Sequence, residues 1–286
     1  DSLSDNGNLY ATVGQPTSPP YNRRFTNGLT FAEYLNGPML GFGATSATSN
    51  INYAFAGART DSNSVTLNNS IPGTQDQINA YIAQGGTFGK NTVVTWLAGA
   101  NNLLAVLGQP NLTSAQFTTQ IGAAIAAASA DEARQFQQLA TAGAKTVLVY
   151  RLPDIGLTPR SQAAGATAIL GGTSASDSFN AALDAQARAA AVANPGTNFI
   201  EVDLTGFLRT AVANPGAFGL TNVNTACFDG ANVCADPTKY LFWDSIHPTD
   251  TAHRLIATYT YMHLYAASLA AGVTSLGETG LWARRS

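Results

Sequence analysis

The sequence predicts an α/β fold, a three-layer α/β/α sandwich with a central parallel sheet. Short β-rich apolar runs occur at 92–97, 146–150 and 198–204, with a weaker run at 51–55. Long Ala-rich stretches of helical length occur at 114–142 and 174–193. Strands that alternate with helices in this way predict a parallel sheet covered on both faces, because each crossover helix packs back onto the sheet.

Helix boundaries are marked by capping and breaking residues. The stretch 174–193 stops at Asn194-Pro195-Gly196, where proline and glycine end a helix. Pro248 and Thr249 introduce a last helix that runs to about Ala270. The loop before that helix lies where it can reach the carboxyl ends of the strands, which is where ligands bind in open α/β sheets.

Composition limits the classes of function. The chain has 286 residues, and we expect one domain over 1–286 and a monomer. Charged residues make up 11% and the net charge is −3, so the sequence lacks the basic footprint of a nucleic-acid or anionic-membrane binder. It contains neither an apolar run long enough to span a membrane nor a signal peptide.

The two cysteines, Cys227 and Cys234, lie seven positions apart in a loop rich in Gly, Asn and Asp. A local disulfide is the favoured interpretation, with two free thiols as the alternative. Closing such a loop would contribute roughly 2.5 kcal/mol and would indicate an oxidising compartment. A zinc site is disfavoured because a structural site needs four ligands.

Two segments at opposite ends of the chain supply the groups of an acyl-transfer triad. The chain opens Asp1-Ser2-Leu3-Ser4-Asp5-Asn6-Gly7-Asn8 and later reads Trp243-Asp244-Ser245-Ile246-His247-Pro248. A serine hydroxyl becomes a nucleophile when a histidine removes its proton, and a carboxylate orients that histidine. Ser2, His247 and Asp244 are the candidates for these roles.

Two further segments follow strand-like runs. Gly99-Ala100-Asn101-Asn102 comes after the strongest one, and a loop there can aim the Asn101 amide at a developing oxyanion. Gly57 follows the weaker run, where a glycine lets the backbone approach a ligand and offer its N–H.

A second Asp-x-x-His pattern, Asp250 to His253, competes with Asp244 to His247. Asp250 and His253 fall in the first turns of the predicted last helix, where such a pair is usually a local surface or packing contact. Asp244 and His247 precede the helix, on a loop free to face Ser2. His263, deep in the same helix, is expected to be packed or solvated.

Together these segments resemble the GDSL, or SGNH, hydrolases of the secreted or autotransporter type. The four blocks of the family match residues 1–8 without the leading glycine, 52–58, 99–102 and 244–247, and two further segments match at 19–21 and 24–28. Three residues depart from the pattern: Arg23 and Ala56 replace glycines, and Asn102 replaces an aspartate.

The resemblance implies a flavodoxin-like SGNH hydrolase fold with Ser2 as the nucleophile. It also implies that the backbone N–H groups of Ser2 and Gly57 and the side chain of Asn101 bind the oxyanion. In the family a central strand and a glycine precede the nucleophile, so both are expected to be missing from the sequence that starts at Asp1. The change at Asn102 puts in doubt any role of the family's aspartate.

The expected function is that of a secreted, cell-surface or periplasmic serine esterase, which hydrolyses small-molecule or lipid esters through an acyl-enzyme without a cofactor or metal. Short-chain acyl or acetyl esters are the expected substrates. The sequence has no Gly-x-Ser-x-Gly elbow, which disfavours the α/β-hydrolase arrangement. A lipase or lipid acyltransferase of the same fold, or a non-catalytic carbohydrate- or surface-binding module, remain the alternatives.

Overall fold

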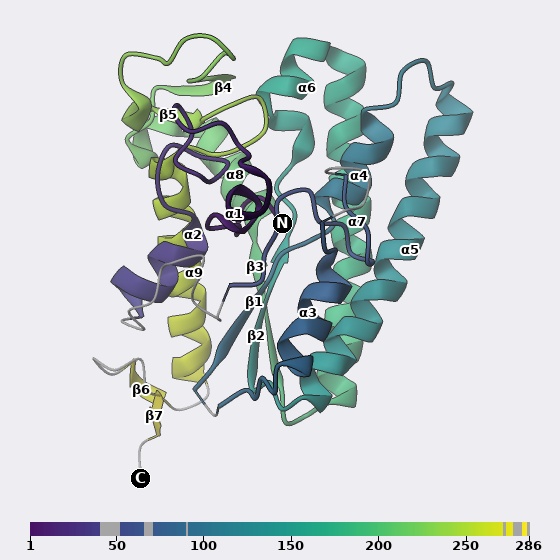
Figure 1. Ribbon diagram of the computed structural model, residues 1–286, viewed down its shortest axis with the longest axis vertical. Helices are drawn as coiled ribbons and strands as arrows, with labels where there is room; N and C mark the ends of the chain where they lie inside the picture. Colours follow the sequence, from purple (N-terminus) through teal and green to yellow (C-terminus); the bar gives the residue numbers. More distant parts are fainter. Residues whose placement is uncertain (41–51, 66–70, 90, 271–272, 277–281, 285–286) are drawn as a thin grey trace.

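The chain folds around a central parallel sheet with helices on both faces (Figure 1). The structure is a computed structural model and describes residues 1–40, 52–65, 71–89, 91–270, 273–276 and 282–284. The central sheet consists of β1 (Val93–Trp96), β2 (Thr146–Arg151) and β3 (Asn198–Asp203), in the order β1-β2-β3. The α/β fold is therefore confirmed, and each of the three strong apolar runs forms a strand.

The middle strand, β2, has a continuously apolar run. Residues 147–150 of β2 are all buried, at 1% exposure or less. A strand with helices on both faces has no solvent side, so hydrophobic residues occupy consecutive positions rather than alternate ones. The polar ends of β2, Thr146 and Arg151, lie where the strand leaves the core.

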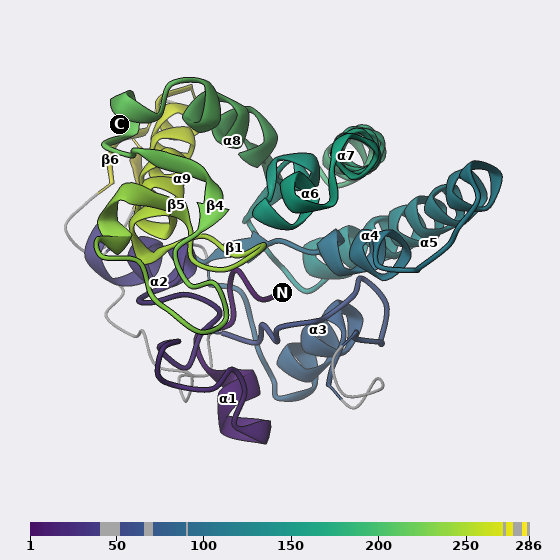
Figure 2. The ribbon, with the colours of Figure 1, turned by 90° about the horizontal axis from the view of Figure 1, so that it is seen from above.

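Helices cover the two faces of the sheet, as Figures 1 and 2 show from perpendicular directions. The first face carries α3 (Thr74–Ala83), α4 (Ala100–Leu107), α5 (Ser114–Thr141) and α7 (Ala166–Ala193). The opposite face carries α2 (Phe31–Tyr34), α8 (Leu204–Ala213) and α9 (Asp250–Ala270). The short helices α1 (Asn8–Val13) and α6 (Pro159–Ala164) belong to the loops at the carboxyl end of the sheet.

The helix predicted from residue 174 begins earlier, at Ala166. Gly171 and Gly172 lower the helix propensity of the added segment, which is why the sequence pattern underestimates its length. Gly172 is there for packing, because a Cβ at this position would lie 2.8 Å from the nitrogen of Gly156. Gly172 thus lets α7 approach the segment that follows β2.

The weak strand expected at 51–55 does not form over residues 52–55, and residue 51 lies outside the described part of the chain. Side chains of the opening segment bind the backbone that a neighbouring strand would otherwise pair. Asn8 Nδ2 donates to the carbonyls of Asn52 and Ala54, both at 2.9 Å. Asn52 Nδ2 donates in return to Ser4 O at 2.8 Å. The segment is therefore held by side-chain hydrogen bonds and not by a sheet ladder.

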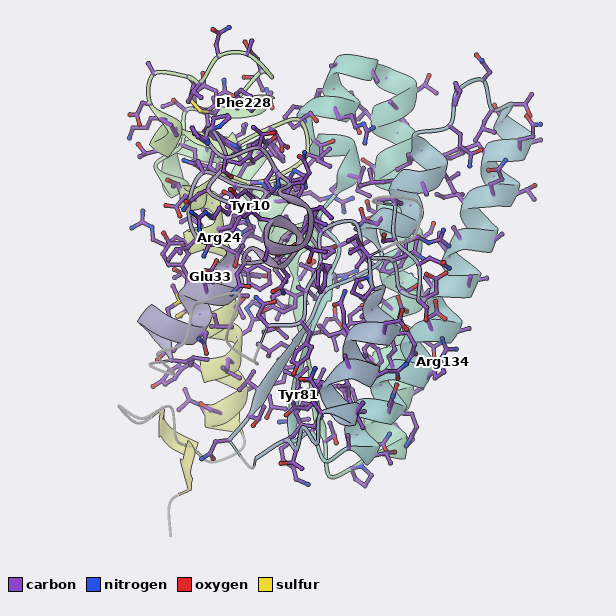
Figure 3. All side chains as sticks on the ribbon, viewed as in Figure 1. Tyr10, Arg24, Glu33, Tyr81, Arg134 and Phe228 are labelled. Carbon is purple, nitrogen blue, oxygen red and sulfur yellow. A yellow bond between two sulfur atoms is a disulfide. The ribbon has the colours of Figure 1, made fainter. Side chains whose placement is uncertain are left out.

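A small second sheet, absent from the sequence prediction, lies beyond the carboxyl end of the central sheet (Figure 1). It pairs β4 (Asn222–Ala226) in parallel with β5 (Tyr240–Phe242). The loop between them contains a disulfide between Cys227 and Cys234, which confirms the predicted bond. Figure 3 shows this disulfide close to Phe228.

The remaining elements are short. They are the single-turn helices η1 (Leu35–Met39), η3 (Ile155–Leu157), η4 (Pro215–Phe218) and η5 (Pro237–Lys239), and the antiparallel strands β6 (Val273–Leu276) and β7 (Trp282–Arg284). None of the helices in the described part of the chain is long and apolar enough to cross a membrane.

A cavity of about 710 Å³ runs along the outer edge of β1. Apolar side chains such as Leu35, Ile78 and Trp96 line it, and Asp1 lies at one end. None of Ser2, Asp244 and His247 lines this cavity. The strand expected before Asp1 stays a prediction.

Candidate active site

Ser2 lies in a tight turn at the carboxyl end of β1. The Asp1 nitrogen donates to Leu97 O at 3.3 Å, and Leu97 directly follows β1. Asp1 O then accepts from the N–H groups of Ser4 and Asp5 at 3.1 and 3.0 Å, which closes the turn around Ser2. This position matches the rule that ligands bind beyond the carboxyl ends of parallel strands.

The loop from Asp244 to His247 follows β5 and folds back on itself. Asp244 Oδ1 accepts the backbone N–H groups of Ile246 and His247 at 2.9 and 2.7 Å. The carbonyl of His247 accepts from Trp243 N at 2.8 Å. The turn is therefore built around the carboxylate. Its backbone hydrogen bonds to Oδ1 fix the Asp244 side chain independently of the contact between Oδ2 and the His247 ring.

The structure brings Ser2, His247 and Asp244 into one hydrogen-bonded chain. His247 Nδ1 lies 2.7 Å from Asp244 Oδ2, and His247 Nε2 lies 3.1 Å from Ser2 Oγ. An ionised carboxylate only accepts hydrogen bonds, so Nδ1 carries the proton and Nε2 presents a lone pair to the serine hydroxyl. This tautomer allows histidine to take a proton from serine.

The Asp244 carboxyl is held in its charged form. Burial alone would raise its pKa, but the opposing attraction of His247 and the hydrogen bonds from the His247 ring and two backbone N–H groups lower the pKa to about 2. The carboxylate therefore stays ionised over the whole range in which histidine titrates. It can hold the imidazole and stabilise an imidazolium.

Tyr21 is a partner of Asp244 that the sequence reasoning missed. Its hydroxyl donates to Asp244 Oδ2 at 2.8 Å, onto the same oxygen that binds the His247 ring. Burial and the neighbouring Asp244 raise the pKa of Tyr21, so the phenol stays protonated. The only sequence signal was the Pro-Pro-Tyr match at 19–21, which does not say what the tyrosine contacts.

Asn101 does not lie in a loop, as the sequence suggested, but in the first turn of α4. The strand ends at Trp96 and the helix begins at Ala100, so only a short connection separates them. Asn101 Nδ2 donates one hydrogen to Ala58 O at 2.9 Å. This bond joins the first turn of α4 to the segment that contains Gly57.

Gly57 is buried and adopts a φ of 84°, in the region that favours glycine. Its carbonyl accepts from Val65 N at 2.9 Å, which fixes the orientation of the peptide. Within the described part of the chain, the N–H groups of Ser2 and Gly57 donate no hydrogen bond, so both remain available as donors.

Asn102, the departure from the family's aspartate, has a structural role of its own. Its Oδ1 accepts from Thr60 N at 3.0 Å, and its Nδ2 donates to Thr60 Oγ1 at 2.9 Å. An aspartate could accept the first hydrogen bond but could not donate the second. The amide thus ties α4 to residue 60, beside the Asn101 contact with Ala58.

The competing pair Asp250 and His253 is not joined by a hydrogen bond among the described residues. Asp250 Oδ1 accepts from Leu29 N and from the Tyr34 hydroxyl, both at 2.8 Å. His253 Nδ1 accepts from Phe31 N at 3.1 Å. Both side chains therefore hold α2 and the residue just before its N-cap. Each makes a packing contact as expected, but with the α2 region and not with the other member of the pair.

His253 is fully buried, and burial, followed by the charge of the nearby His247, lowers its pKa to about 3. It therefore stays neutral at ordinary pH. His263, expected to be packed or solvated, is half-buried and packs its ring against Tyr259 at a centroid distance of 4.3 Å. In the described part of the chain, no group of three or more His, Cys, Asp or Glu side chains could hold a metal ion.

Comparison with known proteins adds a family and several relatives. The family described as GDSL-like Lipase/Acylhydrolase matches residues 1–260. Esterase EstA of Pseudomonas aeruginosa is 38% identical over 144 residues, which cover 43% of this chain and 20% of that protein. A GDSL esterase/lipase of Arabidopsis thaliana is 25% identical over 309 residues, which cover 91% of this chain and 85% of that relative. The alignment with EstA thus spans only a fifth of that protein.

Proposed function

The chain belongs to the family of GDSL-like lipases and acylhydrolases, and on this premise we propose that it is a serine esterase that cleaves short-chain carboxylic esters through an acyl-enzyme. The observation that carries the proposal is the hydrogen-bonded chain from Ser2 through His247 to Asp244. Its distances and its tautomer suit a nucleophile, a general base and an orienting carboxylate.

In the first half of the proposed reaction, His247 Nε2 takes the proton of Ser2 Oγ while the oxygen attacks the ester carbonyl carbon. The carbonyl oxygen gains the negative charge, which the N–H groups of Ser2 and Gly57 and the second amide hydrogen of Asn101 bind. The imidazolium then gives its proton to the leaving alkoxide. The C–O bond to the alcohol breaks, and the acyl group remains on Ser2.

In the second half, a water molecule takes the place of the alcohol. His247 removes a proton from the water, the hydroxide attacks the acyl carbon, and the proton returns to Ser2 Oγ as the carboxylic acid leaves. Asp244 stays charged in both halves, so it holds the Nδ1 proton of His247 in place throughout the reaction.

Replacing the nucleophile tests this proposal. Ser2→Ala should lower kcat/KM for an aryl acetate by at least about 10⁴-fold, because loss of a triad serine removes the covalent route. Ser114→Ala, at an exposed serine of α5, is the matched control and should keep full activity. A serine-directed phosphonate should label the peptide that contains Ser2, and retained turnover in Ser2→Ala would sink the assignment.

We also propose that the protein acts outside the cytoplasm, in an oxidising compartment. The Cys227–Cys234 disulfide supports this location, since such bonds are rare in reducing compartments. Thiol titration of the protein purified from its natural source, without added oxidant, tests it. Two free thiols in that sample would contradict the proposal.

A further inference from the structure

A hollow of about 740 Å³ lies next to the triad, between the segment 15–25 and the loop closed by the disulfide. Its volume falls within the range of small-molecule pockets. The side chains that give it its apolar character are Pro16, Pro20, Tyr21, Phe25, Phe228 and Val233. Among the described residues that line it there is no Asp, Glu, Lys, Arg or His.

Two of its aromatic walls contact the triad directly. The ring of Phe25 lies 5.0 Å from the ring of His247, centroid to centroid, and the Tyr21 hydroxyl binds Asp244. The hollow is therefore on the side of Ser2 occupied by His247. Gly57 and Asn101 are not part of its lining.

This position assigns the hollow to one half of an ester. The leaving oxygen must lie within hydrogen-bond reach of His247 Nε2, because that atom protonates it. The carbonyl oxygen points instead towards the donors of the oxyanion site. The hydrocarbon attached to the leaving oxygen then passes the His247 ring and Phe25 into the hollow, while the acyl chain leaves Ser2 in another direction.

The walls of the hollow are held in place before any ligand binds. Arg24 donates from Nε to Glu33 Oε2 at 2.7 Å and from Nη2 to Glu33 Oε1 at 2.5 Å, and the two side chains are 14% and 2% exposed (Figure 3). This pair anchors the residue next to Phe25. On the opposite wall, the Phe228 ring packs edge-on against Tyr21 at 5.6 Å and the disulfide closes the loop. A preformed apolar site loses little conformational entropy on binding.

We propose that this hollow binds the alcohol half of the ester, and that it selects an uncharged hydrocarbon alcohol, alkyl or aromatic. The inference rests on the proposed esterase function, because it needs His247 to protonate the leaving group. It predicts that selectivity follows the size and charge of the alcohol and depends on the walls formed by residues 15–25 and 227–234. Each methylene that enters the hollow is worth about fourfold in kcat/KM.

The experiment compares esters that differ in one half only. The substrates are methyl acetate, hexyl acetate, methyl hexanoate, and the matched pair 3,3-dimethylbutyl acetate and acetylcholine. Hydrolysis of each ester is measured by pH-stat titration. Wild-type protein should prefer hexyl acetate to methyl acetate, and the neutral 3,3-dimethylbutyl ester to its charged counterpart. Because kcat/KM reports events up to acyl transfer, it is sensitive to the alcohol even when deacylation limits kcat.

Val233→Asp and Val233→Asn introduce a charged and a neutral polar group into the wall, at a residue that is 46% exposed and so tolerates the change. Each should lower the ratio of kcat/KM for hexyl acetate over methyl acetate by about tenfold. The hexanoate-to-acetate ratio of the methyl esters should stay as in the wild type. Val192→Asp and Val192→Asn, at a valine of α7 that is 84% exposed, are the matched controls.

The outcomes separate the two proposals. If Val233 variants change the acyl ratio instead, or change neither ratio, the assignment of the hollow is wrong. A preference for acetylcholine over 3,3-dimethylbutyl acetate would also overturn it, because the site would then bind a cation. Active-site titration with a phosphonate counts the functional molecules in each sample. Activity that survives Ser2→Ala would reject the esterase mechanism itself, whatever the Val233 ratios are.

Discussion

Changing Asp244 to Asn tests the triad through every hydrogen bond of the carboxylate. Oδ1 accepts two backbone N–H groups, and Oδ2 accepts from the His247 ring and from Tyr21. An amide keeps one acceptor oxygen and replaces the other with a donor. The oxygen must stay with the two backbone donors, so the new NH₂ group faces His247 Nδ1. The imidazole proton then moves to Nε2, where it blocks proton transfer from Ser2.

The size of the effect follows from the turn around residue 244. To restore the productive tautomer, the amide must flip and set its NH₂ against the N–H groups of Ile246 and His247. Two lost hydrogen bonds of about 1 kcal/mol each leave this orientation in only about 3% of molecules. The amide also lacks the charge that stabilises the imidazolium. We therefore expect Asp244→Asn to lower kcat/KM by about 10⁴-fold in total.

The assay is kcat/KM for an aryl acetate at neutral pH, with urea unfolding measured on the same samples. The fold should persist, because Tyr21 O can accept a hydrogen bond from the new amide. Asp177→Asn, at an exposed carboxylate of α7, is the matched control and should retain wild-type activity. A loss below tenfold in Asp244→Asn would refute the reasoning, since orientation alone accounts for more than that.

Two other changes give independent checks. Tyr21→Phe keeps the ring contacts but removes a hydrogen-bond donor from Asp244, so the carboxylate attracts the His247 proton more strongly. The acid limb of the pH profile of kcat/KM should therefore move to higher pH. An acid limb at the wild-type pH would contradict the contact between Tyr21 and Asp244. Burial, with a smaller contribution from Asp131, raises the pKa of Glu132 from 4.5 to about 9. Its stabilising effect is therefore complete below pH 4.5 and is lost by up to about 1.4 kcal/mol per unit as the pH rises to about 9. Glu132→Gln should flatten that loss in urea unfolding curves, and parallel curves for variant and wild type would show that the side chain is not buried as described.

The sequence predicted those parts of the molecule that depend on local pattern or on a short motif. Short β-rich apolar runs located β1, β2 and β3, and the run of β2 is continuous because that strand is covered on both faces. The Ala-rich stretch 114–142 predicted α5 to within one residue, and the structure adds a capping box of Thr113 and Gln116 at its start. The order of the motifs was enough to select Ser2, Asp244 and His247 as neighbours.

Contacts between distant segments were beyond the reach of that reasoning. Tyr21 and Asp244 are 223 positions apart, and nothing in either local sequence indicates their hydrogen bond. The weak run at 51–55 has the composition of a strand, but its backbone is bound by the side chain of Asn8. In both cases a long-range hydrogen bond decides the structure, and propensity is only a weak guide to such bonds.

Asp5 explains how this end of the sheet is held together without strand pairing. Its Oδ1 accepts from Gly7 N and Asn8 N at 2.9 and 2.7 Å, and its Oδ2 accepts from Leu9 N and Ala56 N at 3.2 and 2.8 Å. Three of these donors shape the turn after Ser2, and the fourth belongs to the residue before Gly57.

Such side-chain bonds follow from what the proposed chemistry requires of the backbone. If the N–H groups of Ser2 and Gly57 are to bind an oxyanion, their peptides cannot take part in a ladder, where every N–H is paired with a neighbouring strand. The other buried backbone groups of the two segments still need partners. Asp5 and Asn8 supply them from one side, and Asn101 and Asn102 supply them from α4. The short polar residues that mark the motifs in the sequence thus position the backbone that the proposed chemistry would use, and several of them are buried for this structural purpose.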